Sequence, residues 1–164
     1  MLKTDLAYPE QISRLSFRFN KLAIGSYEGL IGIYDLKSAE QIADFRVAEM
    51  VTAIWNNQNF VLIGQCIGPL KIFSLSGNEV FADHDCIDIC YITETNGFLL
   101  LGSYSGSIYL YKVDVSGEIS KVSKTFQPHE SKITGIYLLG NMLLSTAEKC
   151  SEIKKQKFPL KLLE

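Results

Sequence analysis

The chain has 164 residues, of which 47% are apolar and 21% are charged, and its formal net charge is -2. This is the composition of a packed domain, since a disordered chain carries fewer apolar residues and more net charge. So small a net charge creates no long-range field for DNA, RNA or an anionic membrane, and no nucleic-acid partner is expected.

Residues 1–11 precede the first patterned segment and are expected to form an N-terminal extension or an outer strand. They mix Lys3, Asp5 and Glu10 with isolated apolar residues, unlike the continuous apolar stretch of a secretory signal. The longest apolar run, residues 98–101, is too short to cross a bilayer. Four cysteines are too few for a disulfide framework in a chain of this length. We therefore expect an intracellular protein, cytoplasmic or nuclear, without integral membrane contact.

Three segments of the chain repeat one pattern. They read Leu-Ala-Ile-Gly-Ser-Tyr-Glu-Gly over residues 22–29, Val-Leu-Ile-Gly-Gln-Cys-Ile-Gly over residues 61–68 and Leu-Leu-Leu-Gly-Ser-Tyr-Ser-Gly over residues 99–106. Gly25, Gly64 and Gly102 are in register, with spacings of 39 and 38 residues. A fixed period of this length indicates an array of similar structural units.

Each repeat contains four runs of β-branched and aromatic residues that are bounded by turn residues, which predicts four short strands. The expected strands span 12–17, 22–26, 30–36, 40–45, 50–55, 60–64, 69–75, 79–83, 87–92, 98–103, 107–113, 119–126, 132–138 and 142–146. Asn96 and Gly97 predict a tight hairpin with positive φ angles. No segment before residue 147 has a sustained helical period, so the fold class is expected to be all-β.

The fourth repeat is interrupted. After Ala147 the alternation of apolar and polar residues stops, and residues 148–164 hold five of the 16 basic residues. We therefore expect this repeat to lack its outer half and to end in a lysine-rich tail. The predicted units are 12–45, 50–83, 86–126 and a partial unit 129–147, followed by the tail 148–164.

One segment carries a recognisable signature. Gly25-Ser-Tyr-Glu-Gly-Leu-Ile-Gly-Ile-Tyr-Asp35 resembles the WD-repeat pattern Gly-Ser-x-Asp-Gly-x-Ile-x-x-Trp-Asp, with Tyr34 in the Trp slot and Asp35 matching. Phe73 and Tyr111 fill the Trp slot of the next two repeats. With the period of the repeats, these residues make residues 12–147 similar to the WD-repeat family.

The fourth repeat adds His129, four residues before Ile133, at the spacing of the family's Gly-His dipeptide from its first buried strand residue. His129 is placed to meet Ser145 or Thr146. The Asp and Trp slots of this repeat fall on Glu148 and Lys154, so no repeat has the complete set of polar residues that stiffens a blade in this family.

The resemblance implies β-propeller blades, in which each four-stranded sheet covers the next. Three blades and a partial fourth do not close a ring, so the chain is a piece of a longer product, half of a ring shared by two chains, or an open arc. An open arc would expose apolar faces near Ile12 and Ile136 and favour self-association. The resemblance assigns structural roles to Gly25, Gly64, Gly102, Tyr34, Asp35, Phe73 and Tyr111.

The function that this resemblance implies is a non-enzymatic protein-interaction scaffold in a eukaryotic complex, which binds other proteins through the turns between second and third strands. Tyr27 and Tyr104 lie at the same place in two such turns, and aromatic residues are favoured interface anchors. His129 and Glu130 lie on a connection expected to open to the same face. The alternative is that the tyrosines cover neighbouring turns and that His129 is structural.

A second candidate function is attachment to anionic lipid or nucleic acid through the basic tail, whose apolar residues are Phe158, Leu160, Leu162 and Leu163. The run Asp83, His84, Asp85 and Cys86 has the residue types of a metal site. Consecutive residues of an extended chain point in opposite directions, so no metal and no cofactor are expected. No phosphate loop or nucleophile motif indicates an enzyme.

Overall fold

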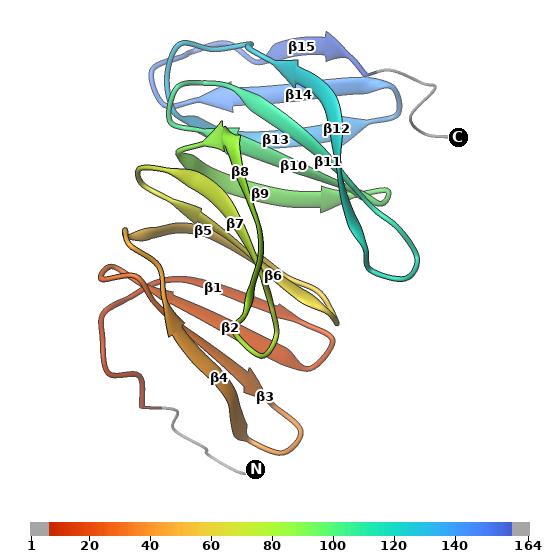
Figure 1. The fold of residues 1–164 in the computed structure, drawn as a ribbon. Coiled ribbons are helices and arrows are strands. Elements are labelled where there is room, and N and C mark those ends of the chain that lie inside the picture. Colours follow the sequence, from red (N-terminus) through yellow and green to blue (C-terminus); the bar gives the residue numbers. More distant parts are fainter. Residues whose placement is uncertain (1–6, 159–164) are drawn as a thin grey trace, which may run out of the picture. The chain divides into compact units, whose positions relative to one another are not determined.

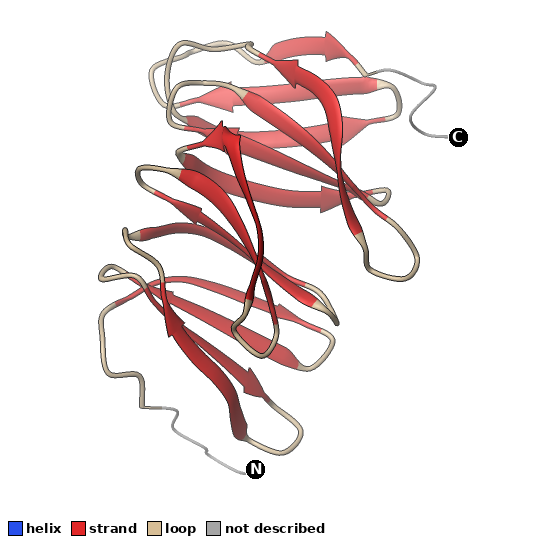
Figure 2. Ribbon diagram, viewed as in Figure 1, coloured by secondary structure: helices blue, strands red, loops and turns tan. Residues whose placement is uncertain are grey.

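The computed structural model describes residues 7–158. These residues form fifteen strands in four antiparallel sheets, and no helix occurs among them (Figures 1 and 2). The predicted all-β class is therefore confirmed. Over the same residues there is accordingly no helix with the length and apolarity needed to cross a membrane.

The chain divides into two compact units, Met1–Ile87 and Asp88–Glu164, each with two sheets. In the first unit, sheet 1 has the order β1 (Ile12–Arg18), β2 (Lys21–Ser26), β3 (Leu30–Asp35) and β4 (Glu40–Arg46), and sheet 2 has the order β5 (Val51–Asn56), β6 (Phe60–Gln65), β7 (Pro69–Ser74) and β8 (Glu79–Ile87). In the second unit, sheet 3 consists of β9 (Ile89–Thr95), β10 (Phe98–Ser103), β11 (Ile108–Val113) and β12 (Ile119–Phe126), and sheet 4 of β13 (Ile133–Leu139), β14 (Met142–Ala147) and β15 (Lys154–Lys157).

Most strand boundaries lie close to the predicted ones because turn residues mark them in the sequence. Asn96 and Gly97 have φ angles of 51° and 74°, as the predicted tight hairpin requires. The main difference is β8, which continues to Ile87 and so includes His84, a residue expected in a loop.

The repeated glycines mark places where neighbouring sheets approach closely. A Cβ atom on Gly25 would lie 2.5 Å from Cγ1 of Val51, and one on Gly102 would lie 2.5 Å from Cγ2 of Ile133. Both contacts are far too short for a real side chain, so the first strand of the next sheet packs directly on the glycine backbone. Gly64 lies at the same register on β6, paired with Ala53.

Each unit has its own apolar core between its two sheets. The residues that fill the Trp slot are buried in both units: Tyr34, Phe73 and Tyr111 are 7%, 5% and 1% exposed. The Phe73 ring packs on Phe45 of β4 with ring centroids 4.5 Å apart. The core of the first unit comprises Ala23, Ile31, Ile33, Val47, Val51, Ile54, Val61, Ile63 and Phe73, and that of the second unit comprises Phe98, Leu100, Ile108, Leu110, Phe126, Ile133, Ile136, Leu143 and Phe158.

The prediction that the fourth repeat lacks its third strand is wrong. β15 forms inside the expected tail and pairs with Met142–Ser145 of β14. Paired residues in this hairpin, such as Leu143 and Gln156, are 13 residues apart, whereas Leu22 and Tyr34 of sheet 1 are 12 apart. The extra residue in the turn places Gln156, not Lys154, in the Trp slot.

Phe158, expected in the tail, is fully buried in the core of the second unit. Its ring lies edge-on to Phe98 with centroids 5.5 Å apart, and its backbone nitrogen donates a hydrogen bond of 2.7 Å to the Asn141 carbonyl. The other apolar residues of the expected tail, Leu160, Leu162 and Leu163, lie outside the described residues.

The expected exposure of the end sheets is right for Ile12, which is 43% exposed, and wrong for Ile136, which is 1% exposed. Side chains alternate between the two faces of a strand, and Ile136 faces the core of the second unit. The exposed apolar residues of β13 are its neighbours on the other face, Tyr137 and Leu139.

Candidate functional site

Tyr27 and Tyr104 occupy equivalent turns, as the sequence predicts. The Tyr27 nitrogen donates to the Gln11 carbonyl and the Tyr104 nitrogen to the Asp88 carbonyl, each over 3.0 Å. These bonds tie the end of the second strand to the residue before the first strand. The Tyr27 side chain is 47% exposed, whereas Tyr104 is half-buried.

Tyr104 lies beside a cation that sequence reasoning did not identify. The Lys132 ammonium is 5.3 Å from the centroid of the Tyr104 ring, and 3.9 Å from the Glu148 carboxylate. Lys132 precedes β13 and Glu148 follows β14, and the Glu148 nitrogen donates 2.9 Å to the Lys132 carbonyl. The turn before β11, the connection before β13 and the turn after β14 therefore meet at one end of the second unit.

His129 has a structural position at this end. It is 5% exposed, and its Nε2 atom lies 3.0 Å from the Ser145 hydroxyl, a partner that the sequence predicts. Gln127 Nε2 donates to the carbonyls of His129 and Ser105, over 2.8 and 2.9 Å. The connection that carries His129 is thereby fixed to the turn that carries Tyr104.

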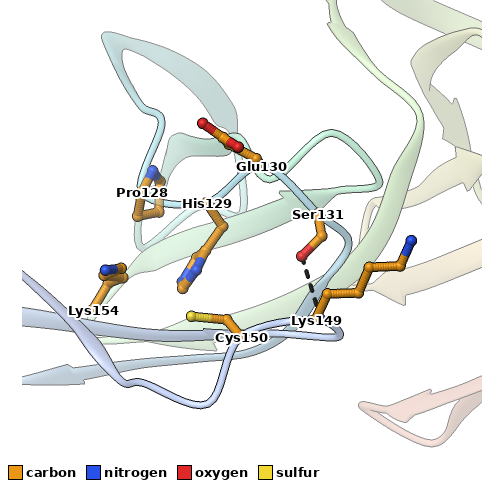
Figure 3. A pocket seen from close by; sticks show the side chains of 7 residues that line it. All are labelled: Pro128, His129, Glu130, Ser131, Lys149, Cys150 and Lys154. Carbon is orange, nitrogen blue, oxygen red and sulfur yellow. Dashed lines mark hydrogen bonds between the residues drawn. The ribbon is translucent and has the colours of Figure 1, made fainter.

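An open pocket of about 440 Å³ lies beside this connection (Figure 3). Its lining consists of Pro128, His129, Glu130, Ser131, Lys149, Cys150 and Lys154. Figure 3 shows the Glu130 carboxylate and the Lys149 ammonium pointing away from the His129 ring, and the Lys149 nitrogen donates 3.4 Å to the Ser131 hydroxyl. The pocket thus has charged side chains of both signs around it.

Lys154 enters the pocket from β15. Its ammonium lies 3.0 Å from the Glu152 carboxylate, which raises the pKa of Lys154. We call the region formed by Tyr104, Lys132 and the pocket residues the turn surface of the second unit. It brings together three of the four predicted partner-binding residues, Tyr104, His129 and Glu130. Sequence reasoning missed its lysines because they come from strand ends with no motif of their own.

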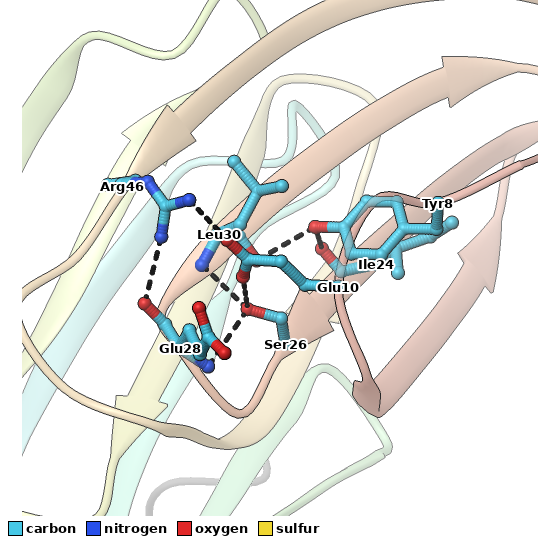
Figure 4. Close-up of polar contacts among 7 residues, drawn as sticks. All are labelled: Tyr8, Glu10, Ile24, Ser26, Glu28, Leu30 and Arg46. Atoms are coloured by element: carbon cyan, nitrogen blue, oxygen red, sulfur yellow. Dashed lines mark hydrogen bonds and ion pairs between the residues drawn. The ribbon is translucent and has the colours of Figure 1, made fainter.

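Tyr27, the fourth predicted residue, lies in a turn that the N-terminal segment covers (Figure 4). Residues 7–11 form no strand. Instead, the Tyr8 hydroxyl donates 2.8 Å to the Leu30 carbonyl, and burial raises the pKa of Tyr8, so the hydroxyl keeps its proton. The Ser26 hydroxyl donates 2.6 Å to Glu10, whose carboxylate also pairs with Arg46.

This network extends to the backbone of the turn. The Ser26 oxygen accepts hydrogen bonds from the nitrogens of Leu30 and Glu28, over 2.8 and 3.2 Å, and Arg46 Nη1 donates 3.0 Å to the Glu28 carbonyl. The Ser26 hydrogen bond and the Arg46 guanidinium hold the pKa of Glu10 below its usual range, against partial desolvation. Glu10 therefore stays ionised at neutral pH and fixes the turn.

Asp35, predicted as structural, stabilises another turn of sheet 1. Its carboxylate pairs with Lys21 of the adjacent strand and accepts a hydrogen bond of 2.8 Å from the Lys37 nitrogen. The Lys21 hydrogen bond is the main reason that the pKa of Asp35 is lowered.

The run of possible metal ligands lies within β8. Asp83 and Cys86 are buried, whereas His84 and Asp85 are exposed, so their side chains do not gather at one point. Over residues 7–158 the structure contains no group of three His, Cys, Asp or Glu side chains that could hold a metal ion.

No protein-family model matches the sequence, and no curated protein matches it. Two computationally designed proteins with crystal structures, Ika4 and Ika8, have a similar fold. The chain is 21% identical to Ika4, with a TM-score of 0.70 over 93% of this chain and 94% of Ika4. It is 21% identical to Ika8, with a TM-score of 0.71 over 90% of this chain and 46% of Ika8. At these identities the similarity concerns the fold alone.

Proposed function

We propose that this chain is a non-enzymatic protein-interaction scaffold that binds a peptide or a domain of a larger complex at the turn surface of the second unit. The observation that carries the proposal is the open pocket of about 440 Å³ next to the Tyr104–Lys132 pair. An aromatic ring held in place by a cation loses little conformational entropy when a partner packs on it, which suits an interface anchor.

We further propose that the four sheets are propeller blades of the WD-repeat type. The period near 39 residues, the antiparallel order within each sheet and the close packing at Gly25 and Gly102 all support this reading. In such a fold the binding surface lies on turns, while the strands provide a rigid support.

The alternative, attachment to lipid or nucleic acid through residues 148–164, stays a prediction with weaker support. Lys154, Lys155 and Lys157 belong to β15, and Phe158 is buried, so it does not serve as a membrane anchor in this fold. The cytoplasmic or nuclear location also stays a prediction.

A selection of peptides from a random library on the immobilised full chain tests the scaffold proposal. We expect selected peptides to bind Tyr104→Ala and Lys149→Ala about tenfold more weakly than the original chain, as for interface anchors. Fluorescence polarisation measures the affinities, and circular dichroism confirms that the variants are folded.

Tyr27→Ala is the matched control, since it changes the equivalent turn of the first unit. Weaker binding by this variant would add the first unit to the binding surface. Equal affinities for all variants, or no selectable peptide, would show that the turn surface of the second unit is not the binding site.

A further inference from the structure

Sheets 1 and 4 each present one face with large exposed apolar side chains. On sheet 1, Leu15 and Phe17 are each 59% exposed and Phe19 is 58% exposed, next to Ile12. We call these four residues the front patch. On sheet 4, Tyr137, Leu139 and Met142 are 63%, 71% and 41% exposed, and we call them the back patch. Adjacent exposed apolar residues of this size mark an interaction surface more often than isolated ones do.

The front patch occupies a face that other sheets cover. Leu15 pairs with the fourth residue of β2, and the same register is held by Ile54 in sheet 2 and by Ile136 in sheet 4. Ile54 is 9% exposed and packs in the core with residues of sheet 1, and Ile136 is 1% exposed and packs with residues of sheet 3. The repeat is therefore built so that the preceding sheet covers this face, and on sheet 1 the described residues leave it open.

The contact between consecutive sheets includes a recurring hydrogen bond. Ser13 Oγ of sheet 1 donates 2.7 Å to the Val51 carbonyl of sheet 2. In the second unit, Cys90 Sγ of sheet 3 lies 3.5 Å from the Ile133 carbonyl of sheet 4. A small donor side chain at this register thus connects each of these sheets to the first strand of the next.

Sheet 4 has the same donor without a following sheet. Thr134 holds the register of Ser13 and is exposed, with its hydroxyl 3.1 Å from the Thr146 hydroxyl. On sheet 1, the residue at the register of Val51 is Ile12. The donor on sheet 4 and the carbonyl on sheet 1 therefore match the two halves of the recurring hydrogen bond.

The apolar side chains match in the same way. Asn56 of sheet 2 lies against the Arg18 carbonyl of sheet 1, with Nδ2 3.4 Å from the oxygen. Phe17 holds the register of Asn56, and Leu139, paired with Met142, holds the register of Arg18. When a sheet 1 follows a sheet 4 in this arrangement, an apolar ring meets two apolar side chains.

We propose that the back patch of one copy of this chain packs on the front patch of a second copy, continuing the sheet-on-sheet packing found within each unit. Phe17 lies against Leu139 and Met142, and the Ile12 carbonyl accepts a hydrogen bond from Thr134. The two surfaces differ, so the contact is heterologous. The match to 46% of Ika8 shows that a fold of this kind also occurs as part of a chain about twice as long.

Thr146 makes this contact looser than the internal ones. It holds the register of Gly25 and Gly102, where even a Cβ atom would lie 2.5 Å from the next sheet. Ile12 of the second copy meets the Thr146 side chain there and is held farther away. We therefore expect association only at high protein concentration, and tighter association for Thr146→Gly.

Sedimentation velocity of the full chain over a range of concentrations, with the variants Phe17→Asp and Leu139→Asp, tests the proposal. The original chain associates, and each variant alone is monomeric because one of its two patches is charged. An equimolar mixture of the two variants forms a one-to-one complex, since one intact front patch and one intact back patch remain. Thr146→Gly shifts the association constant upward by about tenfold, the value of relieving a modest steric clash.

Three results would overturn the proposal. A monomeric original chain at all concentrations means that something else covers the patches. Undiminished association of Leu139→Asp alone means that two front patches meet each other. A monomeric mixture of the variants, each shown by thermal unfolding to be folded, means that the front and back patches do not meet.

Discussion

In the first unit, residues 8–10 lie over the turn between β2 and β3, whereas in the second unit the equivalent turn borders an open pocket. Ser26 of the first turn is bonded to the ionised Glu10, which Arg46 holds in place. Ser103, at the same register in the second turn, bonds only within its own turn, with its oxygen 2.9 Å from the Ser105 hydroxyl and 3.0 Å from the Ser107 nitrogen.

The backbone does not explain this difference. Tyr27 and Tyr104 make the same bond to the residue before the first strand, with the same length. What differs is the segment that crosses the turn, and the side chains it brings. One repeat can therefore serve as a sealed structural unit or as an open binding surface without any change in its sheet.

The largest effect is expected for Phe158→Ala, which would break the comparison by releasing β15 and with it one wall of the pocket. Removing a fully buried Phe leaves a cavity and costs about 3 to 5 kcal/mol. Urea denaturation measures this loss. Lys155→Ala, on the exposed side of the same strand, is the control and should change stability little. A loss for Phe158→Ala as small as that of the control would show that Phe158 is not a core residue.

The paired variants Ser26→Ala and Ser103→Ala sharpen the comparison. Both serines are fully buried, but Ser26 also donates to an ionised carboxylate. A hydrogen bond to a charged group is worth more than a neutral one, so we expect losses of about 2 kcal/mol for Ser26→Ala and about 1 kcal/mol for Ser103→Ala. The free energies of unfolding, measured under the same conditions, decide this. Equal losses would mean that Glu10 contributes nothing to the first turn.

The same comparison predicts a pH dependence confined to the first unit. The pKa of Glu10 is lowered in the folded chain, so its contribution is fully present above the unfolded pKa of about 4.3 and is lost as the pH falls through the lower, folded value. The stability difference between the original chain and Glu10→Gln should therefore shrink in acid. Glu28→Gln, in the same turn, is the control, since Glu28 joins the network through its backbone. A difference independent of pH would exclude an ionised Glu10.

The strands were largely predictable because β-branched runs and turn residues are local signals. β15 was not, since Lys-Lys-Gln-Lys has no apolar alternation, and what holds the segment is its pairing with β14 and the burial of Phe158. The pocket was not predictable either. Its lysines approach His129 only because the hairpin of sheet 4 is one residue longer than the others, which no motif records. His129 with Ser145 was predicted, since that spacing recurs in a known repeat.

The smallest effect concerns the Tyr104–Lys132 pair, which distinguishes an open turn with an ordered anchor from one that is merely uncovered. A double-mutant cycle with Tyr104→Phe, Lys132→Met and the double variant isolates their coupling, because each change keeps the bulk of the side chain. A partly exposed cation over an aromatic ring is worth about 0.5 kcal/mol, and Phe retains part of it, so Tyr104→Leu serves as the stronger variant. Lys132 also lies 3.9 Å from Glu148, so the cycle is repeated with Glu148→Gln. If the coupling disappears in that background, the carboxylate and not the ring positions Lys132, and Tyr104 is held by packing alone. If the coupling persists, the ring is fixed by its cation before any partner arrives, which is the property that an interface anchor needs.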